Sequence, residues 1–116
     1  MKKFIVLYMA PAGTMEEWQK QPAEVREPEE KKMQAEWGVW MQQHAAMIKE
    51  TAGLGKTTRV TAQGSADTKN DLMLYSIVEG ESQEAVAKTF EGHPHFGIPG
   101  ATIEIMPANV LPGMPA

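Results

Sequence analysis

The chain has 116 residues, with 11 Lys and Arg against 15 Asp and Glu, which gives a formal net charge of −4 at pH 7. This length suits a single domain, and the acidic balance argues against a general nucleic-acid binder, which needs clustered positive charge. The chain contains no cysteine, which excludes disulfides, thiolate catalysis and zinc–thiolate sites. No stretch approaches the roughly 20 apolar residues of a membrane-spanning helix, so we expect a cytoplasmic protein that binds neither nucleic acid nor membrane.

Residues 2–9 are predicted to form the first strand, because the run is rich in β-branched and aromatic side chains. Thr14 is predicted to cap a helix, with Glu17 completing a capping box, and Pro22 limits that helix to about two turns.

A longer helix is predicted from Pro28 to about Lys49, ended by Gly53 and Gly55. Its apolar and aromatic positions recur at spacings of four and three, and they are Met33, Trp37, Trp40, His44 and Met47. Such spacing places all five side chains on one face of a helix.

The rest of the chain is predicted to contain three more strands and one short helix. In chain order they are a strand at 57–63, a polar turn at 64–70, a strand at 71–78, a short helix from Ser82 to Phe90, a loop at 93–100 and a strand at 101–106. The order strand, helix, strand, strand, helix, strand is that of the ferredoxin-like split βαβ fold. We therefore expect an α+β domain at 1–107, with a four-stranded antiparallel sheet and helices on one face, followed by a tail at 108–116.

The first strand is apolar on both of its faces. Alternate side chains point to opposite sides of a sheet, and here the two sets are Phe4, Val6 and Tyr8 against Ile5, Leu7 and Met9. The third strand is also apolar on both sides, whereas the second and fourth alternate, so the first and third are expected at the centre. Helices on one face leave the other apolar face open, and a second copy of the chain is its simplest cover. The sequence thus predicts a homodimer.

Three segments carry a resemblance to a known family. They are Lys3-Phe4-Ile5-Val6-Leu7-Tyr8, Trp37-Gly38-Val39-Trp40-Met41, and the ending Phe90-Glu91-Gly92-His93-Pro94-His95-Phe96 with Thr102-Ile103-Glu104-Ile105-Met106-Pro107. The chain resembles the YCII-related (YciI-like and DGPF-type) family of the dimeric α+β barrel group. The resemblance implies that fold, a dimer and an enzymatic role. The Asp-Gly-Pro-Phe motif of one branch is absent, and the helix histidine of some members has no counterpart near residues 36–38.

His93 and His95 are the first candidates for chemistry, because imidazole titrates near neutral pH and can serve as acid, base or ligand. The alternative is a structural turn in which both rings bond to the backbone and pack the sheet edge. Neither a metal nor a cofactor is demanded by the sequence.

His44 is the third candidate, one helical turn after Trp40. It either packs between helix and sheet or lines a cavity whose walls are Tyr8, Trp37 and Trp40, and Phe96 is a further ligand-binding candidate. The sequence leaves two functions open. One is an enzyme that performs acid–base chemistry on a small organic molecule, and the other is a non-catalytic module that binds a small ligand or another protein.

Overall fold

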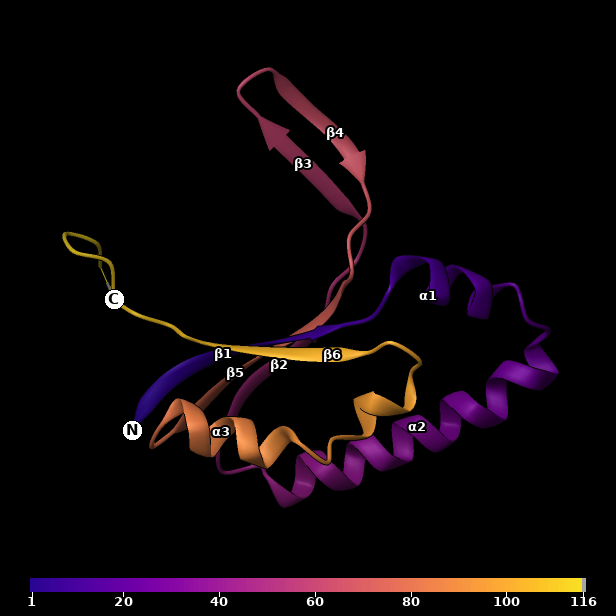
Figure 1. The fold of residues 1–116 in the computed structure, drawn as a ribbon, viewed down its shortest axis with the longest axis horizontal. Coiled ribbons are helices and arrows are strands. Elements are labelled where there is room, and N and C mark those ends of the chain that lie inside the picture. Colours follow the sequence, from indigo (N-terminus) through magenta and orange to yellow (C-terminus); the bar gives the residue numbers. More distant parts are fainter. Residues whose placement is uncertain (116) are drawn as a thin grey trace.

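Four antiparallel strands form the main sheet in the computed structural model, which describes residues 1–115 (Figure 1). Their order across the sheet is β2 (Ile48–Gly53), β5 (Leu72–Gly80), β1 (Lys2–Met9) and β6 (Thr102–Pro107). The prediction that the two strands with apolar residues on both faces lie at the centre is confirmed, as is the ferredoxin-like α+β fold.

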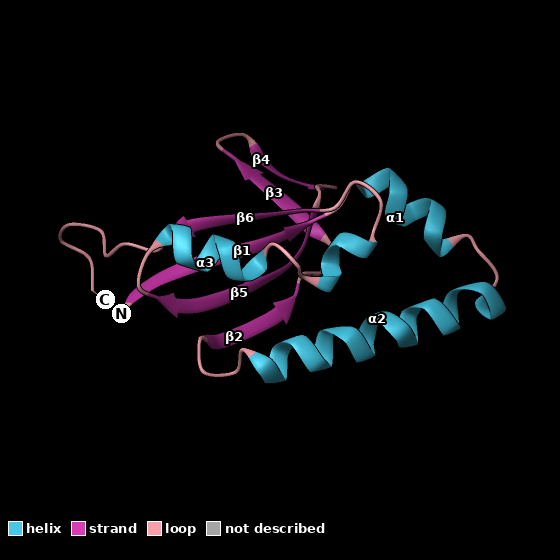
Figure 2. Cartoon of the chain, turned by 60° about the horizontal axis from the view of Figure 1, so that its bottom comes forward, coloured by secondary structure: helices cyan, strands magenta, loops and turns pink. Residues whose placement is uncertain are grey.

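Helices α2 (Ala23–Gln43) and α3 (Gln83–Phe90) lie on one side of this sheet with the short 3₁₀ helix η1 (Pro94–Gly97), whereas α1 (Ala12–Gln19) lies beyond the end of β1 (Figures 1 and 2). Strands β3 (Thr57–Thr61) and β4 (Gly64–Thr68) pair with each other as a separate hairpin, which projects from the opposite side of the sheet (Figure 1). Within the described residues, no helix is both long enough and apolar enough to cross a membrane.

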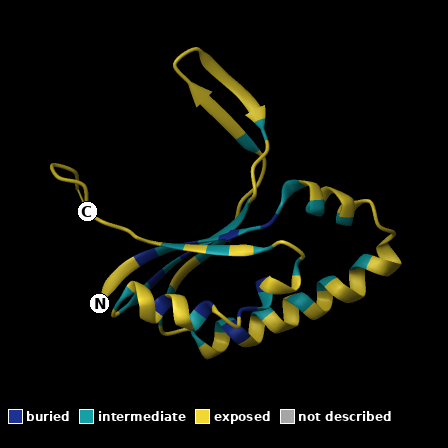
Figure 3. Cartoon of the chain, viewed as in Figure 1, coloured by how far each residue is buried: buried dark blue, intermediate teal, exposed yellow. Residues whose placement is uncertain are grey.

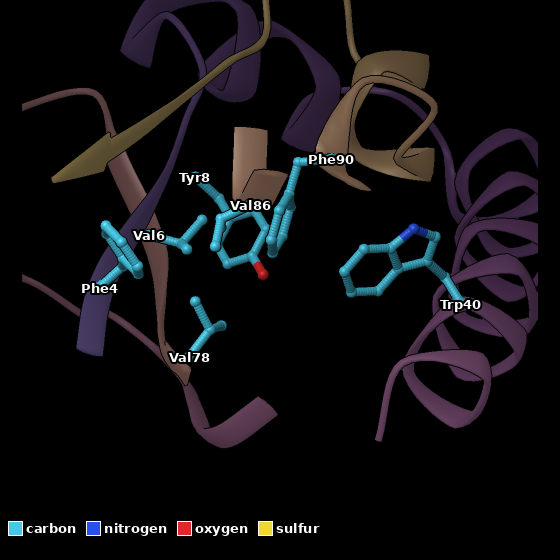
Figure 4. Close-up of a cluster of buried hydrophobic side chains, with 7 residues drawn as sticks. All are labelled: Phe4, Val6, Tyr8, Trp40, Val78, Val86 and Phe90. Carbon is cyan, nitrogen blue, oxygen red and sulfur yellow. The ribbon is translucent and has the colours of Figure 1, made fainter. Parts of the chain in front are cut away.

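The core lies between the sheet and the helices (Figures 3 and 4). Its buried side chains are Phe4, Val6, Tyr8, Trp40, Val78, Val86 and Phe90. The other set of β1 side chains, which includes Ile5 and Leu7, faces away from the helices and is only half-buried. One chain therefore covers one face of its sheet and leaves the second face partly open, as the sequence predicted.

The second strand of the sheet was predicted in the wrong place. The strand that pairs with β5 is β2, which lies within the segment predicted as the end of the long helix and its glycine stop. The helix ends at Gln43. The backbone N–H of His44 donates the last helical hydrogen bond, to the Trp40 carbonyl, and the chain turns at this point. The segment predicted as the second strand instead forms the hairpin, whose second strand occupies much of the predicted turn 64–70.

The predicted starts of the first two helices also need correction. α1 begins at Ala12 with no side-chain cap, so Thr14 lies inside the helix. α2 begins at Ala23, directly after Pro22, and Pro28 lies within it. A proline in the second turn costs one backbone hydrogen bond, and this exposed turn accommodates the loss. The cap at Ser82 is confirmed, since its hydroxyl accepts a hydrogen bond from the Ala85 N–H at 3.1 Å.

Gly80, at the end of β5, leaves room for α3. A Cβ atom at this position would overlap a methyl group of Val86, which is buried in the core. We expect Gly80→Ala to lower the free energy of unfolding by about 1–3 kcal/mol through overpacking. Urea denaturation measures this change.

Gly38 offers the matched control for Gly80. It lies inside α2 with no atom within 4 Å of the position a Cβ would take, so Gly38→Ala should stabilise the chain by up to about 1 kcal/mol through helix propensity. Equal effects of the two substitutions would contradict the packing of α3 described here.

Candidate functional site

A cluster of aromatic and imidazole rings lies between the inner face of β1 and the helices. Tyr8 is at its centre, with ring centroids 5.0 Å from Trp37, 5.3 Å from His93, 5.6 Å from His95 and 6.2 Å from Phe90. Tyr8 and His95 are 0% exposed and His93 is 2% exposed. The fold thus brings together four of the predicted site residues from three distant parts of the sequence.

The His93 ring is held by its own turn and by both tryptophans of α2. Its Nδ1 accepts a hydrogen bond from the backbone N–H of His95 at 2.9 Å, so the neutral ring carries its proton on Nε2. Trp37 and Trp40 each lie 4.4 Å from the ring, centroid to centroid. Burial lowers the pKa of His93 to about 4, with smaller contributions from the charges of His95 and His44. His93 is therefore a neutral ring at pH 7.

The His95 ring has the opposite arrangement of its two nitrogens. Its Nε2 lies 2.8 Å from the carbonyl oxygen of Met9. A carbonyl can only accept, so Nε2 donates and Nδ1 carries the lone pair. Burial lowers the pKa of His95, while the backbone of Met9 and of Thr102 acts in the opposite direction.

Each of these two rings has one nitrogen without a partner. His93 Nε2 and His95 Nδ1 are both buried and make no hydrogen bond to any described residue. The first is an N–H donor and the second an acceptor, in rings whose centroids are 6.5 Å apart. A buried polar atom left unpaired costs about 1–3 kcal/mol. A hydroxyl group could accept a hydrogen bond from the first or donate one to the second.

His44 lies at the C-terminal end of α2. Its ring stacks on Trp40 with centroids 4.2 Å apart, and its Nδ1 lies 2.8 Å from the Trp40 carbonyl, to which it donates. The Nε2 atom of this half-buried ring is left with a lone pair. His44 thus caps the C-terminal end of α2, and its ring packs against Trp40 at the edge of the cluster.

Two hydroxyl residues of the site were not found from the sequence. The Tyr8 hydroxyl lies 2.8 Å from Ser76 Oγ, and Ser76 Oγ lies 2.7 Å from Thr51 Oγ1. Burial raises the pKa of Tyr8, and the bond to Ser76 partly offsets this. A serine on the inner face of an otherwise apolar strand was the available signal.

Phe96 lies at the edge of the cluster, because its ring centroid is 6.4 Å from that of His95 while its side chain is 46% exposed. Three cavities border the helices and the hairpin, and none of them is lined by His93 or His95. The smallest, about 410 Å³, reaches Trp40 between α2 and the turn before η1. Within residues 1–115, no three His, Asp or Glu side chains gather as metal ligands would.

Comparison with known proteins identifies the fold. No family model matches the sequence, and no curated protein does. The chain is similar to the solved structure of 5-chloro-2-hydroxyhydroquinone dehydrochlorinase from Burkholderia phenoliruptrix, in complex with 2,5-dihydroxybenzoquinone. The superposition has a TM-score of 0.51 at 17% sequence identity and covers 88% of this chain and 90% of that one. The two chains share a fold.

The low pKa of His93 makes the stability of the chain depend on pH. An unfolded histidine titrates near pH 6.5 and folded His93 near 4, so between these values the unfolded state binds more protons. The contribution of His93 to the free energy of unfolding is therefore largest above pH 6.5, falls as the pH is lowered towards 4, and is constant below. Urea denaturation at a series of pH values measures it.

His93→Asn is the control for this pH dependence, because its amide oxygen can accept the bond from the His95 N–H without titrating. We expect a shallower fall in the free energy of unfolding between pH 6.5 and 4 in this variant. An unchanged slope would assign the acid sensitivity to other groups.

Proposed function

We propose that this chain is a YCII-related homodimeric protein that performs acid–base chemistry on a small organic molecule at His93 and His95. The observation that carries the proposal is the pair of buried, unpaired ring nitrogens, one a donor and one an acceptor. The proposed site is completed by His44, Tyr8, Trp37 and Trp40. Phe96 would contact a ligand only at the rim of this site.

The two rings suit different parts of a proton transfer. His95 Nδ1 accepts a proton from a hydroxyl or an acidic C–H group of the substrate. The resulting imidazolium is stabilised by the bond from its Nε2 to the Met9 carbonyl. His93 remains neutral and donates its Nε2–H to the substrate oxygen on which negative charge develops. Isomerisation, elimination or hydrolysis can each begin with such a step.

Hydroxylated rings are the probes that the comparison suggests. The enzyme with the shared fold acts on a chlorinated hydroxyhydroquinone and was solved with a dihydroxybenzoquinone. Substrates of this kind present hydroxyl groups that complement a donor and acceptor pair, and a flat ring that complements Trp37 and Trp40.

A non-catalytic ligand-binding module is the second candidate. The observation that favours it is that none of the three cavities is lined by the two imidazoles. In this case the histidines serve to hold the turn before β6 against β1, and ligands bind elsewhere.

Two substitutions separate these functions. His95→Gln keeps a side-chain N–H for the Met9 carbonyl and replaces the basic ring nitrogen with a non-basic amide oxygen, and His93→Asn keeps an acceptor for the His95 N–H and removes the ring Nε2–H. We expect the wild type to bind 2,5-dihydroxybenzoquinone and to release chloride from 5-chloro-2-hydroxyhydroquinone. His95→Gln should slow chloride release by about 10²–10⁴-fold, and His93→Asn by about 100-fold.

Absorbance titration and a chloride electrode give the two measurements, and the thermal midpoint confirms folding of each variant. Binding without chloride release in the wild type would favour the non-catalytic module. Equal rates in wild type and His95→Gln would remove His95 from the chemistry.

The dimer is proposed to form through the open face of the sheet. The half-buried Ile5, Leu7, Tyr75 and Ile77 lie at the centre of this face, since Ile5 pairs with Ile77 and Leu7 with Tyr75 across β1 and β5. The hairpin projects from the same side of the sheet (Figure 1). A two-stranded hairpin is marginally stable by itself, so a second copy would support it while covering the apolar face.

Leu7→Glu tests the proposed interface, because it adds a carboxylate beside Glu104, its partner in the β1–β6 register. We expect the wild type to show twice the chain mass of 12.8 kDa by light scattering, and Leu7→Glu to be mainly monomeric. Val39→Glu, at a 56% exposed position on α2, is the matched control and should remain dimeric. A monomeric wild type at micromolar concentration would contradict the proposal.

A further inference from the structure

The largest cavity by volume among the three lies away from the histidines, between α1, α2 and the segment that follows His95. Its volume is about 790 Å³, within the range typical of small-molecule sites. Figures 1 and 2 show that α1 and α2 are joined by a short loop and spread apart from it. The segment that contains η1 lies beside α2. The space is therefore bounded by three elements of one chain.

Apolar side chains form one wall of this cavity, and Thr14, Gln19, Gln21 and Gln34 add uncharged polar groups to its lining. Met15 and Trp18 come from α1, Met33 from α2, and Ile98 and Pro99 from the segment after η1. All but Pro99 are half-buried in the single chain. Met33 also contacts the backbone of η1, since a Cβ atom at Gly97 would lie 3.2 Å from its methyl group. An indole and two polarisable thioethers thus face a space large enough for an aromatic ring.

The charged groups that line the cavity are all of one sign. They are Glu17, Glu29 and Glu30, and the lining includes no Lys, Arg or His in the described residues. Lys20 lies 3.2 Å from Glu17, and Arg26 lies 3.6 Å from Glu30, whereas none of the ion pairs found in residues 1–115 involves Glu29. The cavity therefore has an apolar wall with an excess of negative charge around it.

We propose that this cavity binds a small organic cation, an amine or quaternary ammonium group attached to an apolar body. The Trp18 indole faces the cation, because a positive charge is attracted to the face of an aromatic ring. Glu29 adds a Coulombic attraction, and the Met and Ile side chains contact the apolar body. The same charges disfavour carboxylates and phosphates. This site does not use the imidazoles, so its test is independent of the acid–base proposal.

Three probes of similar size test the charge preference, namely benzyltrimethylammonium, benzyl alcohol and phenylacetate. They are added to the full-length protein with ¹³C-labelled methionine methyl groups, and the chemical shifts are followed by NMR. We expect saturable shifts of the Met15 and Met33 methyl signals with the cation, about tenfold weaker binding of the alcohol, and no shift with phenylacetate.

Two variants test the residues. Trp18→Leu should weaken binding of the cation by about fivefold or more. Glu29→Gln should weaken it by about twofold to fivefold at low salt, while Glu27→Gln, on the same helix outside the cavity, should leave it unchanged. Because Glu29→Gln alters only a surface charge, it remains informative if Trp18→Leu does not fold.

Three results would overturn the proposal. One is equal binding of the cation and benzyl alcohol, which would show an apolar groove without charge selectivity. Another is stronger binding of phenylacetate. The third is the absence of any saturable shift of the Met15 and Met33 signals at about 10 mM cation, a concentration that fills even a weak site.

Discussion

The hydrogen bond from His95 Nε2 to the Met9 carbonyl joins η1 to the end of the first strand. The two residues are 86 positions apart, and the bond length is 2.8 Å. Met9 lies where a register shift interrupts the ladder between β1 and β5, at the point where the chain leaves the sheet for α1. The bond thereby fixes η1 over the end of the sheet, and α2 packs against η1. The position of the aromatic cluster depends on this one connection.

The sheet itself imposes a second constraint. Both central strands carry apolar side chains on both faces, and the helices of one chain lie on one side only (Figure 3). Val6 and Tyr8 are completely buried on that side, whereas Leu7, between them in sequence, is half-buried on the other. Because alternation in a strand cannot be relaxed locally, the chain cannot hide both sets by small adjustments. A surface of this kind is characteristic of an interface.

The sequence was sufficient to predict which two strands lie at the centre of the sheet, but not one of the edge strands or the limits of the long helix. Met47 continues the spacing of the Trp37 and Trp40 stripe, yet it lies beyond the helix, where a turn returns it to the same core. The helical spacing of apolar residues therefore continues past the end of the helix, and the predicted helix was too long. The strand β2 was hidden because its sequence, Ile48–Gly53, is polar and ends in glycine, and only pairing with β5 makes it a strand.

The candidate site was predicted more completely than the segments around it. His93 and His95 are conspicuous in a sequence with only three histidines, and Tyr8 and the tryptophans follow from strand and helix periodicity. Ser76 was missed because a single polar residue in an apolar strand does not reveal its partner. Its burial and its bond to Tyr8 arise only from the pairing of β1 with β5. Phe96 was included by its place in the loop, and η1 places its half-exposed ring beside His95 at the edge of the cluster.

The chemistry of the two histidines goes beyond what their structural contacts require. Each ring uses one nitrogen to hold the backbone, and asparagine at 93 or glutamine at 95 could make the same bond. Imidazole adds a second nitrogen in each ring, and both are buried with no hydrogen-bond partner among residues 1–115. Leaving one such atom unpaired costs about 1–3 kcal/mol, so a water molecule or a ligand is its expected partner. The turn thus accounts for one nitrogen of each ring, and the acid–base function proposed above is one role for the other.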